Sequence, residues 1–125
     1  MPSKEEHLHK ASCNEEFVKD IGSARSRHLE WVVTGVFYAG LHLVDAYLAK
    51  TAAQHPATHR DRYDCLERAI RQNSRIRDLF KLYRSLRDDS QDARYLPRRF
   101  SCDEVCDEVL PRFTSLKALL RPYLG

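Results

Sequence analysis

The longest apolar stretch of the chain runs from Trp31 to Leu48, and it contains no proline and no cluster of turn residues that would end a helix. Its large apolar residues would surround most of a helix: Trp31, Val32, Val33, Val36, Phe37, Leu41, Leu43, Val44, Tyr47 and Leu48. A helix that is apolar nearly all round lies at the centre of a bundle. We therefore predict a central helix from about Arg27 to Lys50. Its predicted core residues are Trp31, Phe37, Leu41, Val44 and Leu48.

One polar row interrupts this apolar surface. Tyr38, His42 and Asp45 are spaced i, i+4 and i+7, so they share a face of the helix. A buried carboxylate or imidazole is costly without a partner. Two interpretations follow: the row pairs with a neighbouring helix, or it faces a functional cleft. In either case Asp45 is predicted to be paired, with Tyr38, His42 or an arginine of the third helix.

Capping signals place the other helices. Ser3 with Glu6, and Ser101 with Glu104, have capping-box spacing, which predicts helices that start near Lys4 and after Ser101. Gly22 is a natural stop for the first helix.

Thr58 can cap a third helix that carries apolar residues as far as Leu86 and fades between Asp88 and Asp92. Pro111 predicts a kink or break near Leu110 in the last helix. The fold class is therefore all-α, a single domain over residues 1–125 arranged as an up-and-down bundle of four or five helices.

Charge is distributed unevenly. The net charge of the 125 residues is only +3, but residues 60–99 hold twelve Lys or Arg against seven Asp or Glu. Arginine's planar fork suits phosphate and carboxylate groups. Two interpretations remain open for Arg84, Arg87, Arg94, Arg98 and Arg99. They line a phosphate-binding surface, or they pair with the acidic residues Asp88, Asp89 and Asp92.

Metal and membrane signals are weak. Cys102 and Cys106 lie one helical turn apart, but no second close pair completes a zinc spacing. His55 and His59 are spaced i, i+4, but Pro56 disfavours a helix through both. We therefore expect no metal site and no cofactor. The charged first ten residues and the reduced thiols indicate a cytoplasmic protein, and the polar row argues against a membrane span.

The central FYAGLHLVDAYLAK run, followed by a His-Pro loop, THRDR and ARYLP, resembles the HEPN domains, small intracellular helical bundles named for nucleotide binding. The resemblance spans roughly Trp31 to Pro97 and is strongest in the aromatic–small–His–Leu–Val–Asp pattern. It implies a four- or five-helix bundle and a homodimer. It also implies an association with RNA or a nucleotide, or with a nucleotidyltransferase or antitoxin partner.

Members of this family that cut RNA carry an Arg and, five to seven positions beyond it, a His. Here Arg87 would require a His at Asp92, Ala93 or Arg94, and none of these is one. Because Arg stays protonated, it cannot take over the proton transfer. The sequence thus leaves the catalytic residue unknown and favours a protein that is not an enzyme.

The candidate ligand-binding residues are Tyr38, His42, Asp45, His59, Arg60, Arg84, Arg87, Arg94 and Tyr95. His59 and Arg60 are included because the first turn of a helix attracts anions. Arg94 and Tyr95 are placed on a connection after the third helix. The main hypothesis is a non-catalytic domain that binds a nucleotide, RNA or a protein partner. The alternatives are a metal-independent ribonuclease that uses His42 or His59 as a displaced base with Arg84 or Arg87, and a purely structural dimerisation module.

Overall fold

The computed structural model describes residues 2–125, except for the side chain of Ala52, and it confirms an all-α bundle. Short 3₁₀ turns cover Ser23–Arg25 and Ser74–Ile76, and a π-helical turn covers Val105–Val109. The α-helices are α1 (Lys4–Asp20), α2 (Leu29–Ala52), α3 (His59–Gln72), α4 (Asp78–Tyr95), α5 (Cys102–Glu104) and α6 (Leu110–Leu124).

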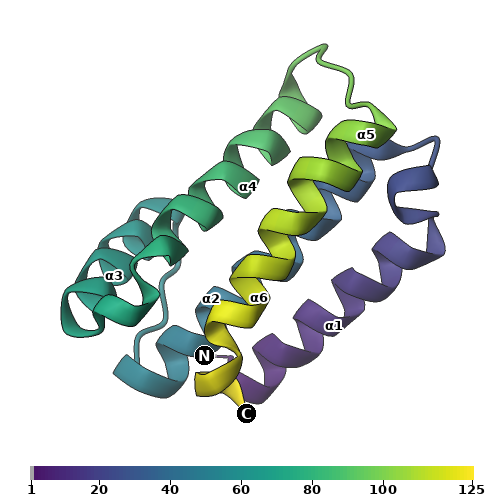
Figure 1. Ribbon diagram of the computed structural model, residues 1–125. Helices are drawn as coiled ribbons and strands as arrows, with labels where there is room; N and C mark the ends of the chain where they lie inside the picture. Colours follow the sequence, from purple (N-terminus) through teal and green to yellow (C-terminus); the bar gives the residue numbers. More distant parts are fainter. Residues whose placement is uncertain (1) are drawn as a thin grey trace.

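The central helix α2 packs against α1, α4 and α6 (Figure 1). The long helices alternate in direction, and both ends of the chain lie at the same end of the bundle. Helix α3 is shorter and packs beside α2 and α4 at that end. This arrangement confirms the predicted position of residues 29–52 as the core helix.

The predicted helix starts are confirmed by their caps. Ser3 and Ser101 each form a capping box, with Glu6 and Glu104 respectively. The hydroxyl of Thr58 accepts a hydrogen bond from the backbone N–H of Asp61 at the start of α3. Each cap satisfies backbone donors that have no partner inside the helix.

The prediction of one continuous third helix is wrong, because the chain breaks between α3 and α4. Asn73 adopts extended backbone angles, and its side chain accepts a hydrogen bond from the backbone N–H of Arg75. Asparagine favours such local bonds over the helical ladder. Ile76 remains fully buried within the break, so the apolar periodicity continues across it. In addition, α4 extends to Tyr95, so Arg94 and Tyr95 lie on a helix and not on a connection.

The irregularity expected near Leu110 takes a mild form. Helix α5, the π-helical turn and α6 follow one another without leaving the helical state, and Pro111 lies in the first turn of α6. In the π-helical turn the N–H of Leu110 bonds to the carbonyl of Val105, five residues back. This wider bonding accommodates a proline that lacks an N–H of its own. The last helix is therefore locally widened and is not broken.

The core predictions hold for four of the five residues named from the sequence. Phe37, Leu41, Val44 and Leu48 are buried, but Trp31 is 56% exposed. Between Trp31 and Ala49, the residues of α2 that keep some exposure share one stripe of the helix: Trp31, Tyr38, His42 and Ala49. Trp31 is exposed because it begins this uncovered stripe. There it lines an apolar hollow with Phe17, Ile21 and His28.

The segment Leu29–Thr51 is long and apolar enough to cross a membrane by length and composition alone. Most of its side chains are buried inside the bundle, which is the pattern of a core helix.

Candidate functional site

A buried ion pair joins α2 to α3 at the end of the polar row. Arg62 donates from Nε to Asp45 Oδ1 at 2.7 Å and from Nη2 to Oδ2 at 3.0 Å. The two side chains are only 8% and 6% exposed. Burial opposes the charge on Arg62, but the hydrogen bonds and charge of Asp45 outweigh it, so the pKa of Arg62 is raised. The prediction that Asp45 is paired is thus confirmed, with an arginine of the third helix as its partner.

Sequence reasoning did not select Arg62, although a signal was available. Arg62 precedes Leu66 by four residues and Ala69 by seven, and both of these are buried on the same face of α3. An arginine on an apolar face is a candidate for a buried ion pair.

His59 lies beside this pair and packs against Phe37, with 6.0 Å between the ring centroids. Its Nδ1 lies 3.4 Å from Nη1 of Arg62 and 3.3 Å from the hydroxyl of Tyr83. Since arginine can only donate, Nδ1 of His59 accepts, and the neutral ring then carries its proton on Nε2. Burial raises the pKa of Tyr83 to about 12, so this hydroxyl stays protonated.

Arg87 and Arg94 approach the same region from α4. Arg87 Nη1 donates to the hydroxyl of Tyr63 at 3.4 Å, and Arg94 Nη1 donates to the hydroxyl of Tyr38 at 2.9 Å. Each guanidinium also lies over the ring of that tyrosine, with Cζ at 5.4 and 5.6 Å from the ring centroids. These tyrosines position the two arginines without neutralising them.

No carboxylate within ion-pair distance of Arg87 or Arg94 is found among residues 2–125. Arg87 Nε is buried without a hydrogen-bond partner, and so is the hydroxyl of Ser90, which lies between the two arginines along α4. Buried donors normally have partners. Two positive charges and unused donors therefore lie on one face of α4.

The charges of this face act on His59. Burial lowers the pKa of His59, and the charges of Arg87, Arg62 and Arg94 lower it further, while Asp45 raises it. His59 is consequently neutral near pH 7, and the cations around it favour an anion over a proton. We call the group formed by His59, Arg87 and Arg94 the α3–α4 basic cluster.

The ion-pairing interpretation of the arginine segment is confirmed for Arg98, and the phosphate-binding interpretation stays a prediction for Arg87 and Arg94. Arg98 pairs with Asp89, Asp92 and Glu104, and Arg112 also bonds Asp89. Burial raises the pKa of Asp89, while Arg112 and Arg98 oppose that rise. Asp89 and Asp92 of α4 are thereby engaged with Arg98 and Arg112 and not with Arg87 or Arg94.

Other predicted candidates lie outside the basic cluster. Arg60 and Arg84 are exposed and have no ion-pair partner in the described part of the chain. Tyr95 is exposed, with Cζ of Arg94 lying 5.1 Å from its ring centroid.

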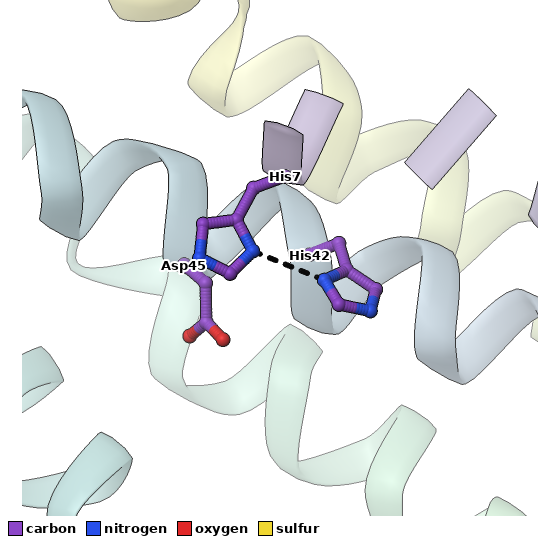
Figure 2. A group of neighbouring side chains, drawn as sticks. All are labelled: His7, His42 and Asp45. Carbon is purple, nitrogen blue, oxygen red and sulfur yellow. Dashed lines mark hydrogen bonds between the residues drawn. The ribbon is translucent and has the colours of Figure 1, made fainter. Parts of the chain in front are cut away.

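His42 lies outside the basic cluster and contacts His7, which was not among the residues selected from the sequence. Nδ1 of His7 on α1 lies 3.1 Å from Nδ1 of His42, and Figure 2 shows the two imidazoles facing each other. Burial and the charge of His7 lower the pKa of His42, Asp45 raises it, and Lys10 and Arg62 lower it. His7 shares a buried face of α1 with Ala11 and Val18, a spacing that marks it as inward-facing.

A second apolar hollow, of about 250 Å³, lies between α1, α2 and α6 and is lined in part by Val18, Val36 and Phe113. It shares no lining residue with the basic cluster.

Comparisons with protein-family models, with curated proteins and with solved structures found no match to this chain. The site is therefore interpreted from its own geometry.

Proposed function

We propose that this chain is a HEPN-like helical domain that binds a phosphate-bearing ligand, RNA or a nucleotide, at the α3–α4 basic cluster without cleaving it. The observation that carries the proposal is the pair Arg87 and Arg94. They lie on one face of α4, beside His59, without a carboxylate partner in the described residues. Arginine forms strong, charge-assisted hydrogen bonds to phosphate oxygens.

His59 supports binding in preference to cleavage. Because its Nδ1 faces Arg62, the neutral ring presents a protonated Nε2, which is a donor. A donor near two arginine charges suits a phosphate oxygen, whereas a general base needs a free lone pair. The resemblance of α2 to the HEPN pattern supports the same ligand class.

The test is fluorescence anisotropy with a labelled single-stranded RNA and with a labelled adenine nucleotide. We expect Arg87→Ala and Arg94→Ala each to weaken binding about tenfold or more, since a hydrogen bond to a charged group contributes about 1.5–3 kcal/mol. Lys81→Ala is the matched control, because it removes one charge from a different, exposed face of α4. An equal loss in all three variants would contradict a localised site.

A ribonuclease is the second candidate, because His59 lies within the charge field of Arg87 and Arg94, and an imidazole with a nearby guanidinium can serve metal-independent RNA cleavage. For this, His59 would take its other tautomer, with Nδ1–H donating to the Tyr83 hydroxyl and a free lone pair on Nε2. Nε2 would remove the proton of the ribose 2′-OH, the 2′ oxygen would attack the adjacent phosphorus, and the P–O5′ bond would break as the 5′ oxygen takes a proton from water. Incubation of RNA in EDTA tests this candidate. Cleavage that is lost in His59→Gln and Arg87→Ala would replace the binding proposal with catalysis.

A further inference from the structure

The His7–His42–Asp45 group is a second cluster of chemical side chains, and it lies on α1 and α2 (Figure 2). His7 and Asp45 are buried and His42 is half-buried. One ligand atom from each of the three residues lies within 4.8 Å of the others. We propose that these residues form a binding site for a divalent transition-metal ion of the zinc class. This inference is independent of the phosphate ligand.

The two imidazoles already have a suitable separation. Zinc–nitrogen bonds of about 2.0–2.1 Å at a tetrahedral angle place two ligand nitrogens about 3.3 Å apart. The Nδ1 atoms of His7 and His42 are 3.1 Å apart. An ion bound to both nitrogens takes the place of the hydrogen bond between them, and each ring turns so that its Nδ1 lone pair points at the ion.

Asp45 can join this pair through a lone pair that Arg62 leaves free. A carboxylate has about four lone-pair positions on its two oxygens, and Arg62 occupies one on each oxygen. Arg62 holds this carboxylate, which points away from the two imidazoles in Figure 2, so Asp45 has to rotate toward His7 to bind the ion. Arg62 then becomes the outer partner that orients a metal-binding carboxylate, as is usual for metal ligands.

The charges that face the pair come from three helices: Lys10 on α1, Asp45 on α2 and Arg62 on α3. Asp45 neutralises Arg62, and Lys10 is exposed, so water screens its charge.

The ligand set indicates which ion is expected. Two imidazoles and one carboxylate suit zinc and cobalt better than magnesium or calcium, which prefer oxygen ligands only. Three protein ligands leave a fourth position for water, as in open zinc sites. Since His7 belongs to α1 and the other two ligands to α2, the ion would also hold the N-terminal half of α1 on the bundle.

The test is titration of the purified chain with Co²⁺, followed by displacement with Zn²⁺. We expect one ion per chain and the intense visible absorption of four-coordinate cobalt. We also expect no thiolate charge-transfer band, because no cysteine is in the set. His7→Ala and His42→Ala should each weaken binding at least about a hundredfold, since loss of an outer-sphere partner alone costs about 10–100-fold.

His9→Ala is the matched control, because it removes an exposed histidine two residues from His7, whose Nε2 lies 3.6 Å from Sγ of the exposed Cys13. If His7→Ala fails to fold, His7→Gln retains a polar side chain, and circular dichroism verifies the helices. A thiolate band, equal loss in the His9 variant, or weak six-coordinate absorption in the wild type would overturn the proposal.

Discussion

Arg62 on α3 holds Asp45 on α2 through two parallel hydrogen bonds of 2.7 and 3.0 Å, in a place where neither side chain meets much water. A central helix with a carboxylate in its surface would be destabilised if that charge stood alone. The pair therefore fixes the position of the short helix α3 against the bundle, and with it the position of His59.

We expect Arg62→Ala to lower the free energy of unfolding by about 3–5 kcal/mol, because it leaves the Asp45 charge buried and unpaired. The double variant Arg62→Met with Asp45→Leu should lose far less, because it removes both charges and keeps the volume. Urea denaturation with circular dichroism measures the difference. The exposed pair Arg71–Glu67 is the control, and Arg71→Ala should cost no more than about 1 kcal/mol. A double variant less stable than both single variants would contradict this account.

Local signals in the sequence were sufficient to predict much of the fold. The caps at Ser3, Thr58 and Ser101 depend on residues three positions apart, so they can be identified without tertiary knowledge. The break at Asn73 could not be identified in this way, because Ile76 is buried inside it and continues the apolar pattern of the flanking helices. Trp31 was misplaced for a related reason. Periodicity shows that a helix is apolar all round, but not which stripe its neighbours leave uncovered.

The candidate site was predicted only in part, because its contacts join different helices. Tyr38, His59, Arg87 and Arg94 were named from the sequence, and the structure places Arg94 on Tyr38 and brings Arg87 and Arg94 to His59. His7 lies 35 positions from His42 and Arg62 lies 17 from Asp45, and no spacing rule relates residues so far apart. The spacing of apolar residues on α1 and α3 predicts that His7 and Arg62 are buried, but the residues that they contact depend on how the helices pack.

Binding to the basic cluster should depend on salt in proportion to the number of arginines engaged. For a single strand, each phosphate contact contributes about 0.7 to the slope of the logarithm of affinity against the logarithm of salt concentration. Arg94→Ala should therefore lower the slope by about 0.7, while Lys81→Ala leaves it unchanged. Anisotropy titrations at several salt concentrations measure this. A wild-type affinity independent of salt would exclude an electrostatic site.

The lowered pKa of His59 predicts a pH dependence of stability. In the unfolded chain His59 takes up a proton near its ordinary pKa of 6.5, while in the folded chain burial and Arg87 keep it neutral to a lower pH. Below pH 6.5 the unfolded state therefore binds more protons than the folded state. The contribution of His59 to the free energy of unfolding is fully present above pH 6.5, and it decreases as the pH falls toward the pKa of His59 in the folded chain.

The measurement compares wild type with His59→Gln by urea denaturation between neutral and mildly acidic pH. As the pH falls, the free energy of unfolding should decrease more in the wild type than in His59→Gln. His55→Gln, which alters an exposed histidine of the preceding loop, should follow the wild type. A difference that does not change with pH would refute the electrostatic description of His59.

Two glycines of α2 should respond oppositely to alanine. A Cβ on Gly35 would lie 2.9 Å from Cγ2 of Val18 on α1, so α1 has to move, and we expect a loss of about 1–3 kcal/mol in Gly35→Ala. A Cβ on Gly40 would lie 3.4 Å from Cδ1 of Leu86, which is an ordinary contact. Gly40→Ala should be neutral or gain up to about 1 kcal/mol of helix propensity. Thermal or urea unfolding ranks the two variants, and the reverse order would mean that α1 packs differently on α2.

The apolar side chains left outside the bundle lead to the prediction of a homodimer, which the HEPN resemblance also implies. Phe17 and Trp31 are at least 43% exposed and line one hollow, with Ile21 at its edge. A two-fold dimer would bury the same patch on both subunits. Light scattering at tens of micromolar should therefore give twice the monomer mass. Trp31→Ala should shift the mass toward the monomer, whereas Tyr95→Ala, which alters an exposed aromatic residue outside the hollow, should not. A monomer mass for the wild type would contradict the prediction, and the basic cluster would then have to bind its ligand within a single chain.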